Sequence, residues 1–369
     1  MKVVDIETWV LTFPLSESFY MSIFPIQRLH ELVVKVHTDE GITGIGQSHG
    51  LAEIVEQDLK RLVIGEDPLR VEHIWEKMFQ TTYRRGLARR GPTRQQILAS
   101  MAAIDIALWD IKGKVANEPL WRLLGGFRTQ VPAYASDGYY RKGGIAVLRE
   151  EMAHYVHDLG YKAVKMKVGG VPLERDVERV RVVREAVGED VDIMLDCNQA
   201  YDIDGAIEAA RHYAPFNIRW YEEPVRWYDS VEGLRQVAAA VPFPVASGEG
   251  EHTLQGCRDL ISRGGIRIMQ FDSTVSGGIT LWLKVAALGE AQGVTMAPHH
   301  DAWIHVHTVA AVPNGLILEC FPNPERDPVW VELFTNPPQV KNGFMVVPEG
   351  PGLGLELNEE TLRRRGQRL

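Results

Sequence analysis

The sequence predicts a mixed α/β protein in which a closed β/α barrel follows a smaller α+β domain. Two observations support the barrel. Eight short apolar runs recur after Gly126 with helical stretches between them, and such alternation is typical of parallel β/α units. The units are roughly 20–30 residues long, which fits a closed barrel better than an open sheet. The third observation concerns residues 1–125, which show a β-meander followed by helices instead.

The N-terminal elements come first. The stretch ELVVKVHTDEGITGIGQ predicts two short strands around the turn Asp39-Glu40-Gly41. From residue 51 to about 125 the pattern is helical. The segment ILASMAAIDIALWDIKGKV predicts a long helix with an apolar stripe that we assign to the core. The segment EPLWRLLGG ends on glycines that suit a helix C-terminus.

The eight apolar runs are the predicted barrel strands. In order they are VPAYAS, AVKMKV, VDIMLDCN, IRWYEEP, FPVASGE, IRIMQFD, VTMAPHH and LILECF. We therefore expect three regions: an N-terminal α+β domain over 1–125, the barrel over 126–322, and a C-terminal segment over 323–369 that returns to the N-terminal part.

Composition limits the classes of protein that the chain can represent. It has 369 residues, of which 45% are hydrophobic, and a net charge of -9. This charge argues against nucleic acid or an anionic membrane as the main partner. No apolar run approaches the roughly 18 residues of a membrane helix, and the N-terminus shows no signal-peptide pattern. The three cysteines are odd in number and widely spaced, so we expect reduced thiols in a cytoplasmic protein.

Ionisable side chains occur at the ends of seven consecutive predicted strands. In a β/α barrel the chemistry lies at the C-terminal ends of the strands, so seven such ends predict one site. The ionisable residues are Lys165, Lys167, Asp196, Glu222, Glu249, Asp272, His299 and Glu319, and Asn198 follows Asp196 at the same strand end.

The acidic members predict a metal site. Asp196, Glu222 and Glu249 follow three consecutive strands, and three carboxylates in one cleft repel each other unless a cation holds them. Oxygen ligands without cysteine suit a hard cation, Mg²⁺ first and Mn²⁺ next. Of Glu222 and Glu223, we expect only Glu222 to point into the barrel, whereas Glu251 stays open as an alternative to Glu249.

The basic members predict two proton-transfer groups. Lys165 and Lys167 share one face of a strand. The charge of each lysine should lower the pKa of the other, and burial should lower both pKa values, toward that of a general base. The alternative is a pair of structural lysines that bridge the acids. Asp272 can orient His299 and raise its basicity. Bases on both sides of a cation suit removal of a proton next to a carboxylate, through an enediolate intermediate.

In this order and spacing the motifs resemble those of the mandelate racemase group of the enolase superfamily, whose use of a lysine or histidine base with Mg²⁺ is well known. The motifs are K-x-K at 165, D-x-N at 196, E-E-P at 222, G-E at 248 and the D…H…E of Asp272, His299 and Glu319. LVVKVHTDEGITGIGQ resembles the capping-domain hairpin, and AIDIALWDIKGKVANEPLWRLLGG resembles the helix that joins cap and barrel. The resemblance covers nearly the whole chain. It implies a (β/α)7β modified TIM barrel with a capping domain built from both chain ends.

The resemblance also implies roles for the residues. Asp196, Glu222 and Glu249 would bind Mg²⁺, with Asn198 beside them. Lys167 would be one acid/base, and Lys165 would depress its pKa and touch the substrate carboxylate. His299, polarised by Asp272, would be the other acid/base, and Glu319 would hydrogen-bond a substrate carboxylate oxygen. Gln47 departs from the glutamate that family members often carry, and the distance along the chain to Glu319 favours His299 over His300.

Three reactions share the first proton transfer: racemisation or epimerisation, dehydration and cycloisomerisation. A cycloisomerase needs no His–Asp pair, and relatives with both motifs are most often acid-sugar dehydratases. We therefore expect a Mg²⁺-dependent acid-sugar dehydratase that forms a 2-keto-3-deoxy sugar acid, with a racemase or epimerase as the alternative. A non-catalytic sugar-acid binding protein on the same scaffold is a third hypothesis.

The cap loops should select the substrate. The loops at 18–30 and 47–53 offer Tyr20, His30 and Ser48. The arginines at 84, 85, 89 and 90 predict a solvated or subunit-interface patch, or else a contact for a second carboxylate. The family resemblance implies a homo-oligomer, from dimer to octamer.

One sequence feature suggests a rival class of enzyme. His305-Val306-His307 matches the sequence pattern of the H-x-H metal motif of amidohydrolases, which are also β/α barrels. The segment is predicted to be a helix, in which residues i and i+2 do not share a face. We therefore interpret both histidines as packing or pocket-rim residues.

Overall fold

The N-terminal domain is built on an antiparallel sheet. The computed structural model of the chain describes residues 1–83 and 92–369. In its four-stranded sheet the order is β14-β1-β2-β3. The strands are β1 (Val3–Tyr20), β2 (Pro25–Thr38), β3 (Thr43–Ser48) and β14 (Gly366–Arg368). The turn between β2 and β3 lies at the predicted Asp39-Glu40-Gly41.

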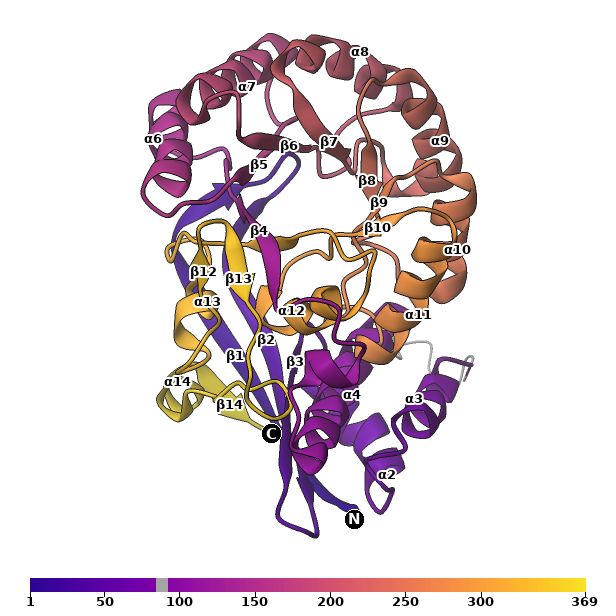
Figure 1. Ribbon diagram of the computed structural model, residues 1–369. Helices are drawn as coiled ribbons and strands as arrows, with labels where there is room; N and C mark the ends of the chain where they lie inside the picture. Colours follow the sequence, from indigo (N-terminus) through magenta and orange to yellow (C-terminus); the bar gives the residue numbers. More distant parts are fainter. Residues whose placement is uncertain (84–91) are drawn as a thin grey trace.

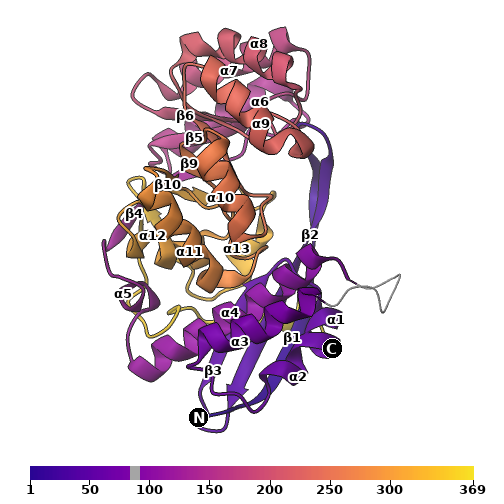
Figure 2. The ribbon, with the colours of Figure 1, turned by 90° about the vertical axis from the view of Figure 1, so that its right-hand side faces the viewer.

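Helices follow the three N-terminal strands, and α3 and α4 lie over one face of the sheet (Figure 2). They are α1 (Ala52–Ile54), the π-helical turn Val55–Leu59, α2 (Lys60–Val63), α3 (Val71–Phe79), α4 (Arg94–Ala116) and α5 (Leu120–Leu123). α4 is the predicted long helix, and it begins at a capping box between Thr93 and Gln96. Gly44 and Gly46 of β3 lie directly against it, since a Cβ on Gly46 would be 1.9 Å from the Ala103 carbonyl oxygen.

The barrel contains eight parallel strands in the part of the chain after residue 126. They are β4 (Gln130–Ser136), β5 (Ala163–Lys167), β6 (Asp192–Asp196), β7 (Ile218–Glu222), β8 (Val245–Ser247), β9 (Ile268–Met269), β10 (Thr295–Met296) and β11 (Leu318–Cys320). β11 pairs in parallel with β4 and a bridge joins Met296 to Gly315, so the sheet closes on itself. Each predicted apolar run contains one of these strands, and the predicted barrel is confirmed.

Seven helices connect the eight strands and form the outer ring of residues 126–322 (Figure 1). They are α6 (Gly144–His157), α7 (Leu173–Val187), α8 (Ile203–Tyr213), α9 (Ser230–Ala240), α10 (Leu254–Arg263), α11 (Gly278–Ala291) and α12 (Ala302–Ala311). This is the (β/α)7β order, because the eighth strand, β11, pairs directly with β4 and closes the barrel.

The C-terminal segment contacts both parts of the molecule. Its elements are α13 (Pro328–Glu332), β12 (Val340–Lys341), β13 (Phe344–Val346), α14 (Glu359–Arg365) and β14. β13 pairs antiparallel with β4 of the barrel, and β14 pairs antiparallel with β1 of the cap. Both chain termini therefore lie at the cap (Figure 1).

The long β1–β2 hairpin extends from the cap sheet to the barrel (Figures 1 and 2). Near its tip, Tyr20 bridges to Tyr140 after β4, and the Ser22 hydroxyl donates to the Val168 carbonyl 2.6 Å away, just after β5. The cap is thus anchored at the barrel end where the predicted site residues lie.

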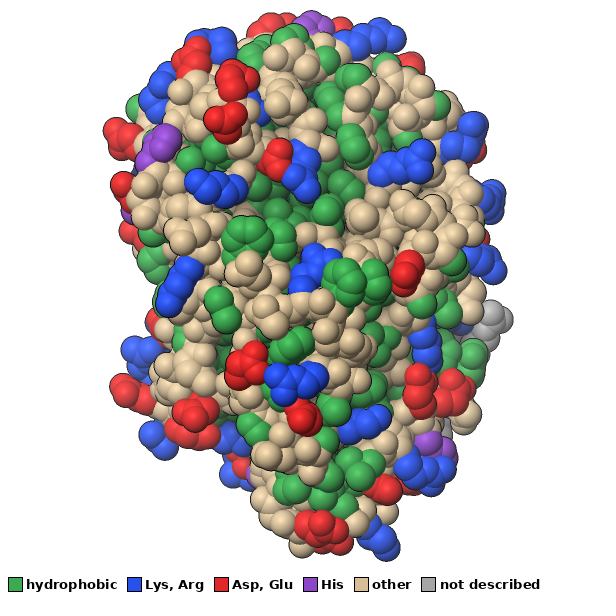
Figure 3. Space-filling view, viewed as in Figure 1, with side chains coloured by type: hydrophobic (Ala, Val, Ile, Leu, Met, Phe, Trp, Pro, Cys, Tyr) green, Lys and Arg blue, Asp and Glu red, His purple; other side chains and the backbone are tan. Residues whose placement is uncertain are grey.

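Two observations bear on the predicted partners. Among the helices that the structure describes, none combines the length and the apolar character that crossing a membrane requires. On the face drawn in Figure 3, acidic and basic side chains are interspersed, as expected for a surface without a strong field of one sign.

Candidate active site

Lys165 and Lys167 both point into the barrel from β5 and are buried. The register aligns Lys167 with Asp196, and Asp196 with Glu222, across β5, β6 and β7. Lys165 donates to Glu222 and, at 2.8 Å, to Glu319, whereas Lys167 donates to Asp196. A strand can hold two buried ammonium groups here because carboxylates from three neighbouring strands surround them.

The direction of the lysine pKa differs from the sequence expectation. Burial lowers the pKa of Lys167, but Asp196, Tyr139 and Glu222 together outweigh burial and the charge of Lys165, so the pKa lies above its usual value. The pKa of Lys165 is likewise raised, because Glu222 and Glu319 outweigh its burial. Lys165 and burial do lower the pKa of Lys167 as predicted, but the predicted net fall toward neutral pH is wrong for the protein without a cation. The sequence shows two like charges but not how closely the acids approach each of them.

Asp196, Glu222 and Glu249 lie at one end of the barrel. Asp196 accepts hydrogen bonds from the backbone and side-chain nitrogens of Asn198, at 2.8 and 3.2 Å. Glu222 accepts one from Trp220 at 2.9 Å. Two buried oxygens, Glu249 Oε2 and Asn198 Oδ1, have no hydrogen-bond partner among the described residues. Burial and the nearby charges of Asp196, Glu319 and Glu249 raise the pKa of Glu222 to about 8, although Lys165 acts to lower it.

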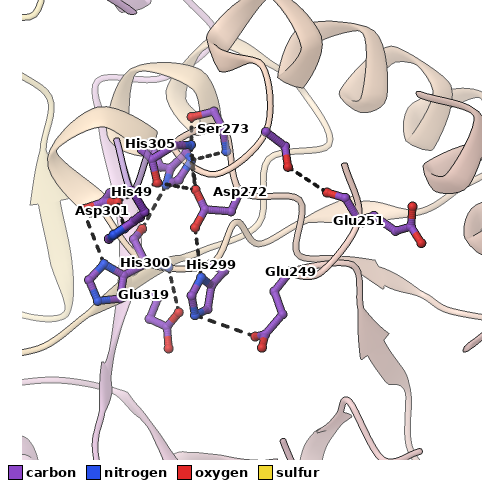
Figure 4. Close-up of polar contacts among 12 residues, drawn as sticks. His49, Glu249, Glu251, Asp272, Ser273, His299, His300, Asp301, His305 and Glu319 are labelled. Carbon is purple, nitrogen blue, oxygen red and sulfur yellow. Dashed lines mark hydrogen bonds and ion pairs between the residues drawn. The ribbon is translucent and has the colours of Figure 1, made fainter. Parts of the chain in front are cut away.

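Glu223 also lies at this end, against expectation. Its backbone adopts a left-handed conformation with φ 41°. Its carboxylate consequently turns toward β8, where it accepts from Ser247 Oγ at 2.8 Å and Gly248 N at 2.9 Å. The prediction that strand alternation would exclude it assumed regular extended backbone. Glu251, the alternative to Glu249, is directed away from the group (Figure 4).

His299 lies between two carboxylates (Figure 4). Its Nδ1 is 2.9 Å from Asp272 Oδ2, and its Nε2 is 3.8 Å from Glu249 Oε2. Burial lowers the pKa of His299, but Glu249, Asp272 and Glu319 outweigh it and raise this pKa to about 10. The predicted pairing of Asp272 with His299 is therefore present, and His299 is in place for proton transfer beside Glu249.

His300 and Glu319 lie beside this pair. His300 has φ 54°, donates its backbone N–H to Glu319 at 2.9 Å, and places its ring 4.4 Å from that of Phe321. Burial raises the pKa of Glu319, but Lys165, His299 and Lys167 outweigh it and hold the pKa well below its usual range. Glu319 is therefore an ionised acceptor in this structure, and the donor role expected of it toward a substrate carboxylate would require a proton.

The three predicted cap contacts are not brought to this group. Ser48 is buried at the end of β3, where its hydroxyl accepts from Gly50 N at 3.1 Å. His30 is exposed on β2 and lies 3.1 Å from the Thr12 hydroxyl. Tyr20 is 50% exposed near the hairpin tip. The arginine cluster at 84–90 lies outside the described residues.

Sequence reasoning missed several buried polar residues on the cap side of His299. Gln47 and His49 at the end of the cap hairpin contact Asp301, and Thr274 contacts both Asp272 and Asp301. His49, His300 and Asp301 offer ligand atoms within 4.8 Å of one another. Because His49 is already 3.0 Å from Asp301, an ion pair accounts for this cluster. The sequence signals were an Asp directly after the double histidine and the glutamine at position 47.

His305 and His307 behave as the helix prediction requires. Both are buried in α12. His305 lies 2.9 Å from the His300 carbonyl and receives the Ser273 backbone N–H at 3.1 Å, and His307 lies 3.0 Å from the Leu353 carbonyl. The two histidines bond in different directions and share no ligand position.

Family models match both parts of the chain. Residues 5–125 match the mandelate racemase / muconate lactonizing enzyme N-terminal domain, and residues 147–361 match the enolase C-terminal domain-like family. The chain belongs to the mandelate racemase/muconate lactonizing enzyme family. The resemblance inferred from the motifs is thereby confirmed.

Members of the family align with nearly the full chain. An arabinonate dehydratase of Saccharolobus solfataricus is 33% identical over 89% of this chain and 88% of its own. A 3,6-anhydro-alpha-L-galactonate cycloisomerase of Streptomyces coelicolor is 34% identical over 90% of both chains. A mandelate racemase/muconate lactonizing enzyme from a marine actinobacterium, solved in complex with magnesium, has a TM-score of 0.89 and 35% identity over 99% of each chain. Relatives thus include dehydratases and cycloisomerases at equal identity.

Proposed function

We propose that the protein is a magnesium-dependent acid-sugar dehydratase, a hydro-lyase acting on a small sugar acid. The observation that supports this most is the placement of two proton-transfer groups from opposite parts of the barrel, Lys167 on β5 and His299 after β10, around one set of carboxylates. Removal of a proton and departure of a hydroxide need one group each, and this arrangement supplies both.

The residues present fit a divalent cation. The group contains five carboxyl groups, Asp196, Glu222, Glu223, Glu249 and Glu319, against two ammonium groups, while His299 and Asp272 compensate each other. Carboxyl groups therefore outnumber ammonium groups in a buried site, which a cation of charge two would help to balance. Glu249 Oε2 has no hydrogen-bond partner among the described residues and lies 3.8 Å from His299 Nε2. All these ligands offer oxygen, as Mg²⁺ prefers. Mn²⁺ would suit the same ligands.

Asp196, Glu222 and Glu249 would hold the ion. When bound, Mg²⁺ would supply positive charge beside the substrate carboxylate and so acidify the adjacent C–H. Lys165 and Lys167 would then share their acceptor oxygens with the ion, which favours hydrogen bonds from these lysines to the substrate. Family relatives are solved with magnesium, in agreement with this assignment.

Each proton transfer of the reaction would then be carried out by a residue of the chain. Lys167, in its neutral form, would take the proton next to the substrate carboxylate, and Lys165 would donate to a carboxylate oxygen. His299, oriented by Asp272 at 2.9 Å, would give a proton to the departing hydroxide from the other side. Glu319 would keep Lys165 in place. The balanced result is loss of water and formation of a 2-keto-3-deoxy sugar acid.

Two alternatives rest on specific observations. The second base beside Glu249 would also allow proton return on the opposite face, which would make the protein a racemase or epimerase. A cycloisomerase needs no His–Asp pair, which counts against that reaction. The 34% identity with a named cycloisomerase keeps that reaction as a candidate.

A substrate screen tests the proposal. The protein would be incubated with Mg²⁺ and a library of mono- and diacid sugars, and 2-keto products would be detected as semicarbazones. We expect a hit that disappears in Lys167→Ala and in His299→Ala. Exchange of the α-proton into deuterated solvent without a keto product would instead indicate an epimerase, and lactone formation or opening would indicate a cycloisomerase. The absence of every signal would support the third hypothesis, a non-catalytic sugar-acid binding protein.

A further inference from the structure

A buried polar side chain of the cap, Gln47, donates to two carboxylates at once. Its Nε2 is 2.7 Å from Glu31 Oε2 and 3.0 Å from Asp301 Oδ1, and its Oε1 accepts from the indole N–H of Trp303. Glu31 and Gln47 come from the cap strands β2 and β3, whereas Asp301 follows His299 in the barrel by two residues. Every polar atom of the Gln47 side chain is therefore used at the cap–barrel contact.

From Asp301 the contacts continue to the catalytic pair. Asp301 Oδ2 lies 2.7 Å from the Thr274 hydroxyl, which lies 2.6 Å from Asp272 Oδ1. Asp272 Oδ2 in turn lies 2.9 Å from His299 Nδ1. Figure 4 shows Asp272 directly above His299, with His49 and Asp301 to the left of this pair. A continuous path of buried hydrogen bonds thus runs from the cap hairpin to His299.

The Thr274 hydroxyl is the critical step in this path, because it has one proton and two carboxylate neighbours. It can donate to Asp272 or to Asp301, but not fully to both. Asp301 has other donors, Gln47 on Oδ1 and His49 at 3.0 Å on Oδ2. Among the described residues, Asp272 Oδ1 accepts hydrogen bonds only from the Thr274 hydroxyl and from the Thr274 backbone N–H, at 2.7 Å. Donation by the cap to Asp301 therefore leaves the Thr274 proton for Asp272.

The other charged groups around this path are consistent with donation of the Thr274 proton to Asp272. His49 lies 3.7 Å from Glu31, His300 lies 3.4 Å from Asp301, and His305 lies 3.7 Å from Asp272. The cap strand adds a backbone contact as well, from His49 N to the Thr274 carbonyl. A glutamate at position 47 would add a third carboxylate between Glu31 and Asp301 and remove the donor to both.

We propose that Gln47 and Thr274 are positioning residues for His299, through which docking of the cap fixes the Asp272–His299 pair. The proposal deepens the proposed function and rests on it for the role of His299. It accounts for glutamine at position 47, where the resemblance led us to expect glutamate: only an amide can donate to Glu31 and Asp301 while accepting from Trp303.

The first test needs no substrate. The full-length protein would be labelled with ¹⁵N-histidine and studied by long-range ¹H–¹⁵N NMR in excess Mg²⁺, with the His299 signals identified by their loss in His299→Asn. We expect Thr274→Val and Gln47→Glu to change the ¹⁵N shifts of the His299 ring, and Thr274→Ser to restore those of the natural protein. Thr8→Val is the matched control, because its buried hydroxyl donates to Glu56 at 2.5 Å within the cap, away from this path.

Unchanged His299 signals in folded Thr274→Val would overturn the proposal. Unchanged signals in Gln47→Glu alone would overturn the part assigned to the cap, and this nearly isosteric variant remains informative if Thr274→Val does not fold. Once a substrate is known, kcat should fall by about 10- to 100-fold in both variants, the usual effect of losing a partner of a reacting group, with little change in KM. Failure of the substrate screen with positive NMR results would count against the proposed function and not against the path.

Discussion

Glu249 differs from the other carboxylates of the site in having a buried oxygen, Oε2, without a hydrogen-bond partner among the described residues. Asp196 and Glu222 each accept from a lysine. An oxygen left in this state lowers stability unless a ligand satisfies it. Glu249 should therefore contribute to cation binding and little to the fold of the free protein.

We expect Glu249→Gln to lose most of the Mg²⁺-dependent rise in melting temperature, because a neutral amide binds Mg²⁺ poorly. Its melting temperature in EDTA should equal that of the natural protein. Glu251→Gln is the matched control and should retain the response to Mg²⁺. Equal Mg²⁺ responses in Glu249→Gln and the natural protein, measured by differential scanning calorimetry, would remove Glu249 from the ligand set.

The identities of the residues at the strand ends could be predicted from the sequence, since barrel geometry directs those ends to one face. Their ionisation could not. The raised pKa of Lys167 depends on a direct contact with Asp196, and the position of Glu223 depends on a backbone φ of 41°. Both are set by tertiary packing, which spacing along the chain does not report.

At the scale of single elements, β3 and α4 show how closely the cap is packed. Gly46 faces α4 with room for hydrogen only. We expect Gly46→Ala to lower the free energy of unfolding by about 3 kcal/mol, because the added methyl would overlap the Ala103 carbonyl. Gly250→Ala has open space around the new Cβ and should change stability by much less. Chemical denaturation would compare the two, and equal losses would refute the packing argument.

Helix α12 carries a pH-dependent destabilisation. Burial lowers the pKa of His307 to about 4, despite its bond to the Leu353 carbonyl. A histidine binds protons more weakly in the folded state here than in the unfolded state, whose pKa is about 6.5. Stability therefore falls as pH drops below about 6.5, and the loss becomes complete near pH 4.

Between pH 7 and pH 5 we expect the natural protein to lose about 2 kcal/mol more stability than His307→Gln, which cannot titrate. His212→Gln, at an exposed position on α8, should follow the natural protein. Urea unfolding at both pH values measures the difference. Parallel losses in His307→Gln and the natural protein would show that other groups cause the acid destabilisation.

The helices and strands could be predicted from the sequence because their hydrophobic patterns extend over many residues. The strand–helix alternation, the α4 stripe and the helical reading of 302–311 all match the structure. The cap contacts could not be read in the same way. Ser48 and His30 lie in a hairpin whose side-chain directions depend on a pairing register, so proximity to the site could not be inferred from composition.

For the whole molecule, the cap and the barrel share a hydrophobic core. One continuous cluster of buried residues includes Val34 and Val36 of the cap sheet, Ile104 of α4 and Leu281 of α11. Asp105 of α4 also accepts two hydrogen bonds from Thr280 of α11. Separation of the two parts would expose this surface, so they should be stable only together.

We therefore expect a single cooperative unfolding transition. Far-UV circular dichroism and tryptophan fluorescence should give coincident curves in urea. A deletion of residues 366–369, which removes β14 from the cap sheet, should move the whole transition to lower urea concentration. Two resolved transitions in either protein would show that cap and barrel unfold independently.

The pairing of β14 with β1 also has a consequence for biosynthesis. β1 ends at Tyr20 and its partner β14 begins at Gly366, so the ribosome makes about 350 residues between the two strands. The first barrel strand likewise waits for β11, which is about 190 residues away, to close the ring. At roughly 5–20 residues per second, the edge of β1 stays unpaired for about 20 seconds or more during translation. Chaperones that protect nascent strands should therefore engage this chain until β14 has been made.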